Sequence, residues 1–380
     1  SCSNRKKSCK SEKMRNRRNV IFLSPLFPTG GITSWTKNML EYIRQANIQN
    51  VIHVDGSIKY KSPNKARHPV YRLISGIVDT LRIFYLLTTG CLKHHPAVIP
   101  IATPGSLSLC KDVFYLIIAK CFRAKCIFHY RFGRIPELSE RKNWEWNLLC
   151  FNMKHAYRII VIDAPSYKAL CDTGFESKTR LIGNPCSPKV ALLANQDVEE
   201  KQKNHYVFVG QIIRTKGVYE LLDSFSQLRN ESHLTMIGPY DEKIKNDLLT
   251  ISQQREGDWF CLLGNQPSEV VLEYMSKADA LILPSYTEGF PNVVLEAMAM
   301  GCPVLATPVG AIRDMIDADS EQAAGICFEA KSADAIIEVL DKFSGVDNHL
   351  DYAINGKRKV LACYTMKSIF SQYQKVWYER

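Results

Sequence analysis

Two glutamates, Glu288 and Glu296, are separated by seven residues within the segment 281–310, LILPSYTEGFPNVVLEAMAMGCPVLATPVG. An apolar run opens this segment, a polar turn containing Gly289 follows, and residues 292–300 then form a helical pattern. The first-turn N–H groups of a helix have no partners within the helix, so a strand, turn and helix in this order can bind an anion. Each ionised carboxylate can accept hydrogen bonds from two vicinal hydroxyls. The segment therefore predicts a site for a diphosphate that carries two hydroxyl-rich rings, which is the shape of a nucleotide sugar.

The sequence of this segment resembles that of retaining glycosyltransferases with the GT-B fold, in particular the group 1 family (glycosyltransferase family 4). The resemblance rests on the pattern Glu-x7-Glu in EGFPNVVLE, on EAMAMGCPV and on the later TPVG. It implies that Glu288 contacts the donor sugar as a catalytic residue and that Glu296 contacts the ribose hydroxyls. The donor phosphates would meet the turn, whose donor-binding residues are Gly289, Phe290, Pro291, Asn292 and Val293. A surface glutamate and a helix-start glutamate stabilised by the helix dipole remain the alternative for either carboxylate taken singly.

A second match to this family is VGQIIRTKG, residues 209–217. The family has Val-Gly-Arg here, followed five residues after the arginine by Lys-Gly, and the two cations hold the donor diphosphate. Lys216 fits this pattern as a catalytic and donor-binding residue, and Gly210 fits the turn, but Gln211 replaces the arginine. Arg214 either supplies the missing positive charge or is a solvated turn residue.

The loop after the first expected strand, SPLFPTGGITSWTKNML, contains Gly30 and Gly31 before a helix that we expect to begin near Thr33. Thr33 or Ser34 would cap that helix. The family has a glycine-rich loop at this place, facing the cleft between the domains. The resemblance implies that Gly30 and Gly31 contact a phosphate or the acceptor, and a bare tight turn is the alternative.

A histidine and an arginine follow the expected strand KCIFH. His129 ends this strand and Arg131 lies two residues beyond it. Family members often carry a histidine at this strand end, near the donor sugar, so the resemblance makes His129 a catalytic candidate and Arg131 a candidate for binding an anionic acceptor. A strand-end histidine whose ring is held by backbone hydrogen bonds is the alternative for His129.

Short β-branched runs alternate with longer amphipathic segments along the whole chain, which predicts an α/β fold with two Rossmann-like βαβ domains. In the GT-B fold two such domains face each other across a cleft. The expected strands are Val20–Leu23, Val51–Val54, Val98–Ile101, Lys125–His129, Arg158–Ile162, Arg180–Ile182, Tyr206–Val209, Leu234–Ile237, Phe260–Leu263, Ala280–Leu283, Val304–Ala306 and Gly325–Phe328.

The domain boundaries follow from composition. A polar stretch with two prolines, 184–204, predicts the linker. We expect an acceptor-binding domain in residues 1–190 and a nucleotide-sugar-binding domain in residues 191–365. The apolar stripe within 366–378 predicts a C-terminal helix, and we expect 366–380 to pack back across the junction.

Charge is distributed unevenly between the two halves. Residues 1–190 carry 31 Lys and Arg against 11 Asp and Glu, a net charge of +20, whereas the rest of the chain has a net charge of −9. The basic half favours an anionic partner, such as a membrane surface or a lipid diphosphate. Eight of these cations precede Asn19, so a solvated basic tail is the alternative.

Several classes of protein are disfavoured by the composition. No stretch has the roughly 18 apolar residues of a membrane span, and the 13 cysteines include no Cys-x-x-Cys pair. We therefore expect a cytoplasmic protein with reduced thiols. Asp317 and Asp319 are expected in a solvated turn, so no metal site and no cofactor are predicted. Nucleic acid is not expected as a partner, because the cations are not interleaved with aromatic residues on one face.

Together these features predict a metal-independent, retaining hexosyltransferase (EC 2.4) that transfers a sugar from a UDP- or GDP-sugar to a glycan acceptor. The segment 71–92 is a strongly apolar helical stretch in the basic half, which is either a buried core helix or a contact with a bilayer or a polyprenyl chain. We favour a lipid-linked acceptor in polysaccharide or glycolipid biosynthesis, with peripheral contact to an anionic membrane at its inner face. A nucleotide-sugar epimerase, a glycan phosphorylase or a non-catalytic sugar-binding subunit remain alternatives.

Overall fold

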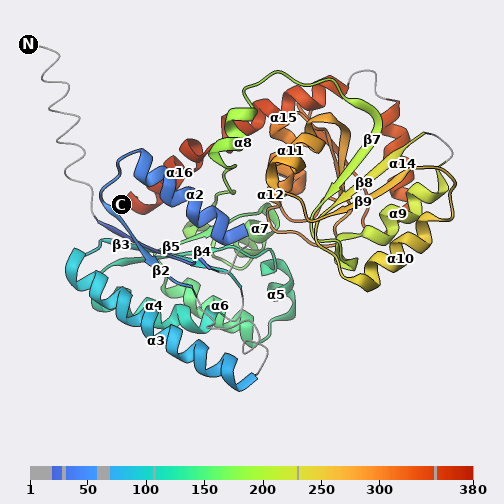
Figure 1. Ribbon diagram of the computed structural model, residues 1–380. Coiled ribbons are helices and arrows are strands. Elements are labelled where there is room, and N and C mark those ends of the chain that lie inside the picture. The colour runs from blue at the N-terminus through green and yellow to red at the C-terminus, as the bar shows by residue number, and fades with distance from the viewer. Residues whose placement is uncertain are drawn as a thin grey trace, which may run out of the picture. The chain divides into compact units, whose positions relative to one another are not determined.

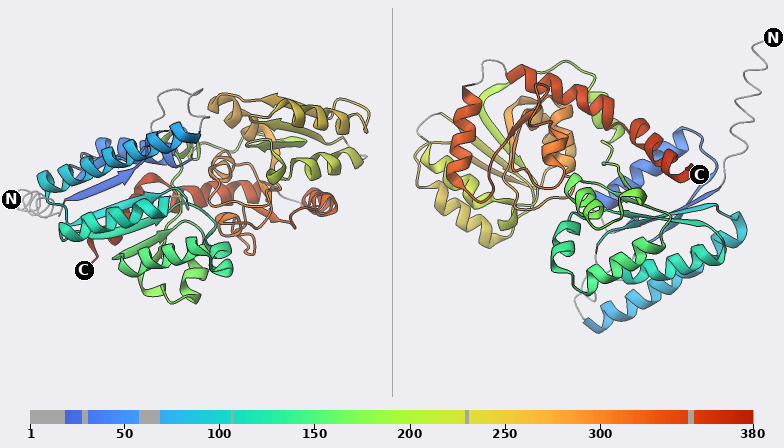
Figure 2. Two further views of the ribbon diagram at one scale, coloured as in Figure 1. Left: turned by 90° about the horizontal axis from the view of Figure 1, so that it is seen from below. Right: turned by 180° about the vertical axis from the view of Figure 1, so that it is seen from behind.

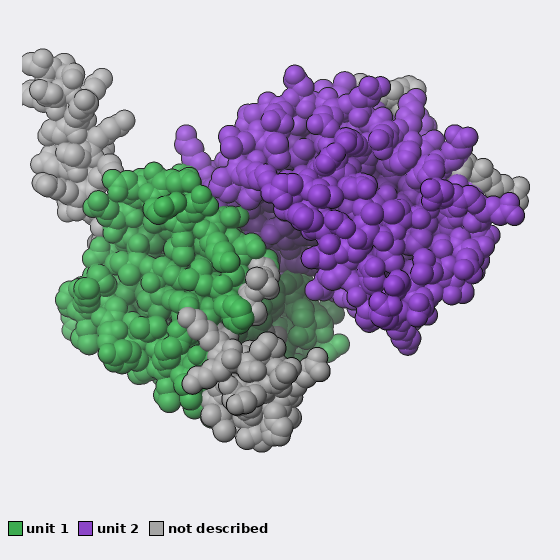
Figure 3. Space-filling view, viewed as in Figure 1, with its two compact units in different colours: residues 1–161, 167–182, 370–380 green, residues 162–166, 183–369 purple. Residues whose placement is uncertain are grey.

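A computed structural model describes residues 19–27, 31–57, 69–105, 108–228, 231–345 and 349–379. The described chain forms two compact units, coloured separately in Figure 3. Unit 1 comprises the described parts of 1–161, 167–182 and 370–380, and unit 2 comprises those of 162–166 and 183–369. Among the described helices, none is both long and apolar enough to span a bilayer.

Unit 1 contains a six-stranded parallel sheet with the strand order β2-β1-β3-β4-β5-β6. Its strands are β1 (Val20–Ser24), β2 (Val51–Asp55), β3 (Val98–Thr103), β4 (Lys125–Tyr130), β5 (Arg158–Val161) and β6 (Thr179–Leu181). The helices of this half are α2 (Gly31–Gln45), α3 (Pro69–His94), α4 (Leu109–Cys121), α5 (Ile135–Arg141), α6 (Trp144–His155) and α7 (Ala164–Asp172), with a 3-10 turn, η3 (Glu176–Lys178).

Helices cover both faces of this sheet, which is why its strands are apolar almost throughout. Helix α2 and the C-terminal helix α16 (Met366–Tyr378) lie on one face, and α3, α4 and α6 lie on the other (Figures 1 and 2). Helix α2 buries Trp35, Met39 and Ile43, which are spaced as one helical stripe. From Phe370 onward α16 belongs to unit 1.

Unit 2 contains a second six-stranded parallel sheet, with the order β12-β11-β10-β7-β8-β9. Its strands are β7 (Gln202–Val209), β8 (His233–Ile237), β9 (Phe260–Gly264), β10 (Ala278–Leu283), β11 (Val304–Ala306) and β12 (Gly325–Cys327). The helices are α8 (Pro188–Leu193), α9 (Val218–Gln227), α10 (Glu242–Ser252), α11 (Ser268–Lys277), α12 (Asn292–Ala299), α13 (Ile312–Met315), α14 (Ala333–Ser344) and α15 (His349–Cys363), with the 3-10 turn η4 (Arg214–Lys216).

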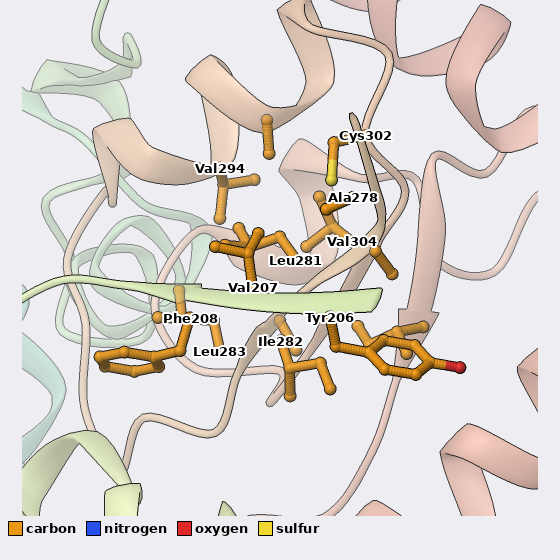
Figure 4. Packing of buried hydrophobic residues seen from close by; sticks show 14 of the residues in the cluster. Tyr206, Val207, Phe208, Ala278, Leu281, Ile282, Leu283, Val294, Cys302 and Val304 are labelled. Atoms are coloured by element: carbon orange, nitrogen blue, oxygen red, sulfur yellow. The ribbon is translucent and has the colours of Figure 1, made fainter. Parts of the chain in front are cut away.

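The core of unit 2 is built on the two central strands, β7 and β10. Figure 4 shows Val207 pointing to the same side as Val294 of α12, whereas Tyr206 and Phe208 point to the other side. All four side chains are at most 3% exposed. Alternate residues of a fully covered strand pack against different helix layers, so β7 and β10 are held rigidly in the middle of the unit.

The structure confirms the predicted α/β fold, and each of the twelve expected strands is present with shifts of a few residues at its ends. The C-terminal helix has the predicted bounds of 366–378. The predicted linker stretch, 184–204, contains the short helix α8, capped by Ser187, and the first residues of β7, which begins at Gln202 rather than at the expected Tyr206. The cap expected at Thr33 or Ser34 is wrong, because α2 begins at Gly31 and both residues lie inside it. The domain boundaries at 190 and 365 stay predictions.

Candidate functional site

The strand order of unit 2 reverses direction between β7 and β10. From β7 the chain proceeds to β8 and β9 on one side of the sheet, and from β10 to β11 and β12 on the other. The connections that follow β7 and β10 therefore diverge at the carboxyl ends of these two strands. Open α/β sheets have their ligand-binding crevice at such a place, which we call the unit 2 crevice. The two motifs singled out in the sequence, 209–217 and 281–310, follow these two strands.

Glycines line this edge of the sheet where side chains would not fit. Gly210 follows β7 and Gly238 follows β8, with φ values of +153° and +149°. A Cβ on Gly238 would lie 1.8 Å from the carbonyl oxygen of Gly210. The two backbones thus approach each other directly, and the edge stays open for a ligand.

The loop after β7 packs against the turn after β10. Gly217 has a φ of +71°, and a Cβ there would lie 2.2 Å from the carbonyl oxygen of Pro284. The backbone N–H of Tyr286 donates to the carbonyl of Thr215 at 2.9 Å. This close backbone contact sets the position of the η4 turn, and with it that of Lys216, relative to the Glu288 turn.

Lys216 and Glu288 form an ion pair at this contact. The Nζ of Lys216 lies 2.5 Å from Oε1 of Glu288, and the two side chains are 23% and 11% exposed. The buried hydroxyl of Ser285 donates to the same carboxylate oxygen at 2.7 Å. A cation and an oriented carboxylate are therefore placed side by side at the crevice, where an incoming diphosphate could take over the cation and sugar hydroxyls could bind the carboxylate.

The turn that carries Glu288 is braced from behind by the TPVG motif. Gly310 has a φ of +59°, and a Cβ on it would lie 2.4 Å from the carbonyl oxygen of Glu288. The next residue, Ala311, donates its N–H to the carbonyl of Gly289 at 2.9 Å. The TPVG motif therefore has a structural role, because it holds the Glu288 turn in place.

The rest of the turn leads into α12, whose first turn faces the same crevice. Pro291 occupies the N-cap position, and no described side chain caps the helix. The ring of Phe290 packs on Gly183, while the amide of Asn184 lies 3.4 Å from Oδ1 of Asn292. The first-turn N–H groups, including that of Val293, are thus held at a fixed place and suit an anion.

Glu296 lies one turn further into α12 and is largely enclosed. Burial raises the pKa of its carboxyl group from 4.5 to about 7. Desolvation penalises the charged form, so this carboxyl is partly protonated near neutral pH. It can therefore serve either as a donor or as an acceptor of hydrogen bonds to a diol.

We expect the buried carboxyl of Glu296 to destabilise the protein at alkaline pH. Its pKa of about 7 exceeds the unfolded value of 4.5, so the free energy of unfolding falls as the pH rises between these two values. The full effect is at most on the order of 3 kcal/mol, because the shift is 2 to 3 pKa units. Glu296→Gln should therefore unfold at a higher urea concentration than the wild type at pH 8 and at nearly the same concentration at pH 4. The matched control is Glu338→Gln, an exposed glutamate of α14. An equal response of both variants to pH would contradict the assignment.

Other predicted donor residues lie nearby with fewer contacts. Arg214 is exposed, and its guanidinium stands 5.7 Å from the ring centre of Tyr219. Gln211, which replaces the expected arginine, is exposed as well. Two residues of this turn, Tyr286 and Ser285, were missed by the sequence analysis, although both stand inside the quoted segment. Tyr286 donates its hydroxyl to Oε1 of Glu220 at 2.6 Å and so connects the turn to α9.

In unit 1, Gly31 lines a cavity of about 320 Å³ at the carboxyl ends of β1 and β3. This is where the strand order of the first sheet reverses. Asp112 and Lys111 at the start of α4 also line it. Burial raises the pKa of Asp112 to about 7, while the hydroxyl of Thr103 donates to its carboxylate at 2.8 Å. Gly30 lies outside the described residues.

His129 and Arg131 lie inside unit 1 in an aromatic cluster, and neither lines that cavity. The ring of His129 is 5.2 Å from that of Trp35 and 5.4 Å from that of Tyr373, and it is 3% exposed. The guanidinium of Arg131 stacks over Trp35 at 3.8 Å. Burial, and then the charge of Arg131, holds the pKa of His129 well below its usual range, so its ring is neutral at pH 7. Their predicted roles stay predictions.

Metal-ligating residues do not converge in the part of the chain that the structure describes, where no group of three or more His, Cys, Asp and Glu side chains could hold an ion. Asp319 of the Asp-x-Asp pair lies instead 2.7 Å from Nε of Arg313. The groups that the structure places at the unit 2 crevice are the amine of Lys216, the carboxyls of Glu288 and Glu296, and backbone N–H groups.

Two Rossmann-like units are the architecture of the GT-B fold, and solved structures with this fold, among them the lipopolysaccharide outer core galactosyltransferase WaaB, superpose on this chain with TM-scores of 0.69 to 0.70. Residues 192–360 match the family model described as glycosyl transferases group 1. This match covers the segment that carries both motifs.

Two similar bacterial proteins are named for the biosynthesis of capsular polysaccharide and of teichuronic acid. The capsular polysaccharide biosynthesis glycosyltransferase CapM of Staphylococcus aureus is 27% identical over 90% of this chain and 92% of its own length. TuaC of Bacillus subtilis, by its name a glycosyltransferase of teichuronic acid biosynthesis, is 28% identical over 45% of this chain, and the alignment spans only 42% of that relative. Among solved structures, Anabaena HepE in complex with UDP superposes with a TM-score of 0.68 at 14% identity, covering 94% of this chain and 98% of that one.

Proposed function

We propose that this chain is a retaining glycosyltransferase, of the hexosyl-transferring type, that uses a UDP- or GDP-sugar donor and a glycan acceptor. The observation that carries the proposal is the ion pair of Lys216 and Glu288, 2.5 Å apart at the switch point of unit 2. A cation can pair with a diphosphate, and a carboxylate can accept hydrogen bonds from sugar hydroxyls. Here the two groups are adjacent at the carboxyl edge of one sheet. The UDP held by HepE agrees with this choice of donor.

In the proposed reaction, the bond between the sugar and the phosphate breaks and negative charge grows on the leaving diphosphate. Lys216 and the first-turn N–H groups of α12 stabilise that charge. Glu288 leaves the ion pair and accepts hydrogen bonds from the sugar hydroxyls, while Ser285 keeps its carboxylate oriented. The acceptor oxygen forms its bond to the sugar on the face that the phosphate leaves, and the leaving phosphate accepts the acceptor's proton. The configuration is therefore retained, and Glu288 is not a nucleophile in this proposal.

The remaining predicted residues have supporting roles in this proposal. Glu296 binds the ribose hydroxyls, and its raised pKa lets it donate or accept. Gly31 and the cavity beside it are the proposed acceptor region, whose carboxyl Asp112 can hydrogen-bond a sugar hydroxyl. Lys216 and backbone dipoles provide the positive potential that a divalent ion would otherwise supply, so we propose a reaction without metal or other cofactor.

The acceptor is proposed to be a lipid-linked glycan of polysaccharide or glycolipid assembly. The basic composition of residues 1–190 supports an anionic acceptor or surface, and the roles that the names of CapM and TuaC state agree with polymer synthesis. We infer action at the inner face of a membrane. The exposed Gln211, in place of the family's arginine, favours one second candidate, a non-catalytic subunit that binds a nucleotide sugar without turnover.

The proposal predicts that the protein releases UDP or GDP from one member of a panel of UDP-, GDP- and ADP-sugars when a membrane lipid extract is present. Release should persist in EDTA and should require Glu288, because its carboxylate is the oriented sugar contact at the crevice. The assay compares the wild type, Glu288→Gln and, as a matched control, the exposed Glu338→Gln. Nucleotide binding without release across the panel would support the non-catalytic candidate, and conversion of the donor to a changed sugar in the absence of any acceptor would support an epimerase.

A further inference from the structure

An apolar surface covers the outer side of the helix layer formed by α3, α4 and α6 in unit 1. The three helices lie on the same face of the sheet (Figures 1 and 2). Each has buried residues along one stripe and exposed residues along the opposite stripe. In a water-exposed layer the outward stripe should be polar. Here the outward stripes carry Leu81 and Tyr85 on α3, Phe114 and Ile117 on α4, and Trp144 and Phe151 on α6, each between 46% and 66% exposed. We refer to these six residues as the apolar face.

Single exposed apolar residues are common, but six large ones on three neighbouring helices indicate an interaction site. On α3 the residues that pack on the sheet, such as Ile83 and Leu87, are fully buried, so the outward position of Leu81 and Tyr85 is not caused by a loosely packed helix. The same holds for α4, where Leu116 and Ala119 are buried. These helices are thus apolar on both sides.

The charges around the apolar face are positive. Lys93, Lys120 and Lys154 stand in the last turns of the three helices, and Arg123 follows α4. All four are exposed, and among the described residues none of them forms an ion pair with a carboxylate. Cations that end an apolar helix face are the arrangement that binds anionic headgroups while the apolar side chains enter the acyl region.

The acidic side chains of α3, α4 and α6 are mostly buried. Helices α3 and α4 carry one acidic residue each, Asp79 and Asp112, which are 6% and 1% exposed. Glu145 of α6 is 17% exposed and lies 3.9 Å from Arg134. An anionic surface would therefore meet cations and apolar groups without a repelling exposed carboxylate on these helices. A second copy of the chain would place the same cations against each other, which disfavours self-association through this face.

We propose that the outer side of α3, α4 and α6 docks on an anionic lipid bilayer, with the six residues of the apolar face entering the interface and the four cations binding headgroups. Tyr85 and Trp144 have the amphipathic rings that favour this depth. The proposal deepens the proposed function by locating where the lipid-linked acceptor would be met. It rests on the surface alone, so it can fail while sugar transfer stands, or hold while transfer fails.

The first test is co-sedimentation of the full chain with vesicles of phosphatidylcholine, with or without phosphatidylglycerol. Wild type should partition onto the anionic vesicles. Leu81→Ser/Phe114→Ser should weaken that partition about tenfold or more, because two large side chains lose their burial. Lys120→Gln/Arg123→Gln should weaken it about tenfold on anionic vesicles only. The matched control is Leu192→Ser/Leu249→Ser, which removes two exposed leucines of unit 2 and should change nothing.

Fluorescence gives a second measurement that does not depend on a variant's folding. Of the five tryptophans, Trp144 is 56% exposed, whereas Trp35, Trp146, Trp259 and Trp377 are at most 7% exposed. Anionic vesicles should shift the emission to shorter wavelength, brominated lipid should quench it, and Trp144→Phe should abolish both effects.

Three outcomes would overturn the proposal: no binding of wild type to anionic vesicles, equal partition of wild type and Leu81→Ser/Phe114→Ser, or no change in Trp144 emission. A dimer that the same double variant dissociates, without vesicle binding, would assign the face to a second copy instead. Nucleotide release with a detergent-solubilised acceptor should be the same in all of these variants, which separates this test from that of the transfer reaction.

Discussion

Replacing Lys216 by alanine is expected to lower kcat by about 10²–10³-fold, the loss seen when one group that stabilises transition-state charge is removed. Lys216 is the side-chain cation whose Nζ touches the Glu288 carboxylate at the switch point, and its 23% exposure lets an incoming phosphate reach it. Arg214 is exposed and its guanidinium stands over the ring of Tyr219, and its predicted role in holding the diphosphate stays a prediction. The measurement is steady-state release of the nucleotide diphosphate, with the donor and acceptor identified by the panel assay.

The ion pair requires a control, since Lys216→Ala also leaves the largely buried Glu288 without its cation. An uncompensated carboxylate can destabilise the fold, and a loss of activity could come from that effect alone. Lys216→Ala/Glu288→Gln removes both charges and should regain stability in urea unfolding. If Lys216 acts on the donor, this double variant stays inactive. Recovery of activity together with stability would show that Lys216 serves only to neutralise Glu288.

Replacing Gly310 by alanine is expected to destabilise unit 2 by about 2–4 kcal/mol, because the change combines an unfavourable backbone conformation with a steric clash. The φ of +59° is strained for a residue with a Cβ, and that Cβ would lie 2.4 Å from the carbonyl oxygen of Glu288 and 2.5 Å from that of Gly289. The clash can be relieved only by moving the turn, which displaces the Glu288 carboxylate from Lys216. We therefore expect weaker nucleotide-sugar binding as well, measured by calorimetry.

Gly257→Ala is the matched control for this prediction. Gly257 also has a positive φ, +96°, and lies in unit 2, but nothing stands within 4 Å of a Cβ there. This variant should lose only the strain energy, about 1–2 kcal/mol, and keep its affinity for the nucleotide sugar. Equal losses of stability and affinity in the two variants would contradict the bracing role of Gly310.

Much of the fold could be predicted because parallel strands covered on both faces are nearly continuous apolar runs between turn residues. Tyr206–Val209 and Ala280–Leu283 have this pattern, and both lie inside strands. The errors fell where local pattern is weak. The short helix α8 has only six residues, and β7 begins with Gln202 and Lys203, whose exposed side chains hide a strand from any hydrophobic pattern. Helix α2 begins at a glycine, which a search for capping side chains passes over.

The candidate site could be predicted only in part. Glu288 and Glu296 are found from local spacing because a strand, a turn and a helix follow one another in the chain. Tyr286 lacks such a signal, since its hydrogen bond to Glu220 joins residues 66 positions apart. Ser285 stands only three residues before its partner Glu288, so a search for local pairs of a hydroxyl and a carboxylate could have found it. His129 stands at a strand end as expected, but whether that end faces a ligand or the interior depends on Trp35 and Tyr373, which come from two distant helices.

By itself, the sequence determined which segments form strands and helices, and which turn residues carry charge, because these depend on spacing over a few residues. Only the tertiary structure decided that Lys216 and Glu288, 72 positions apart, form one site. The physical reason is the strand order, which places β7 beside β10 and so brings the turns at their carboxyl ends together. Burial, which raises the pKa of Glu296 and lowers that of His129, is likewise set by packing from remote parts of the chain.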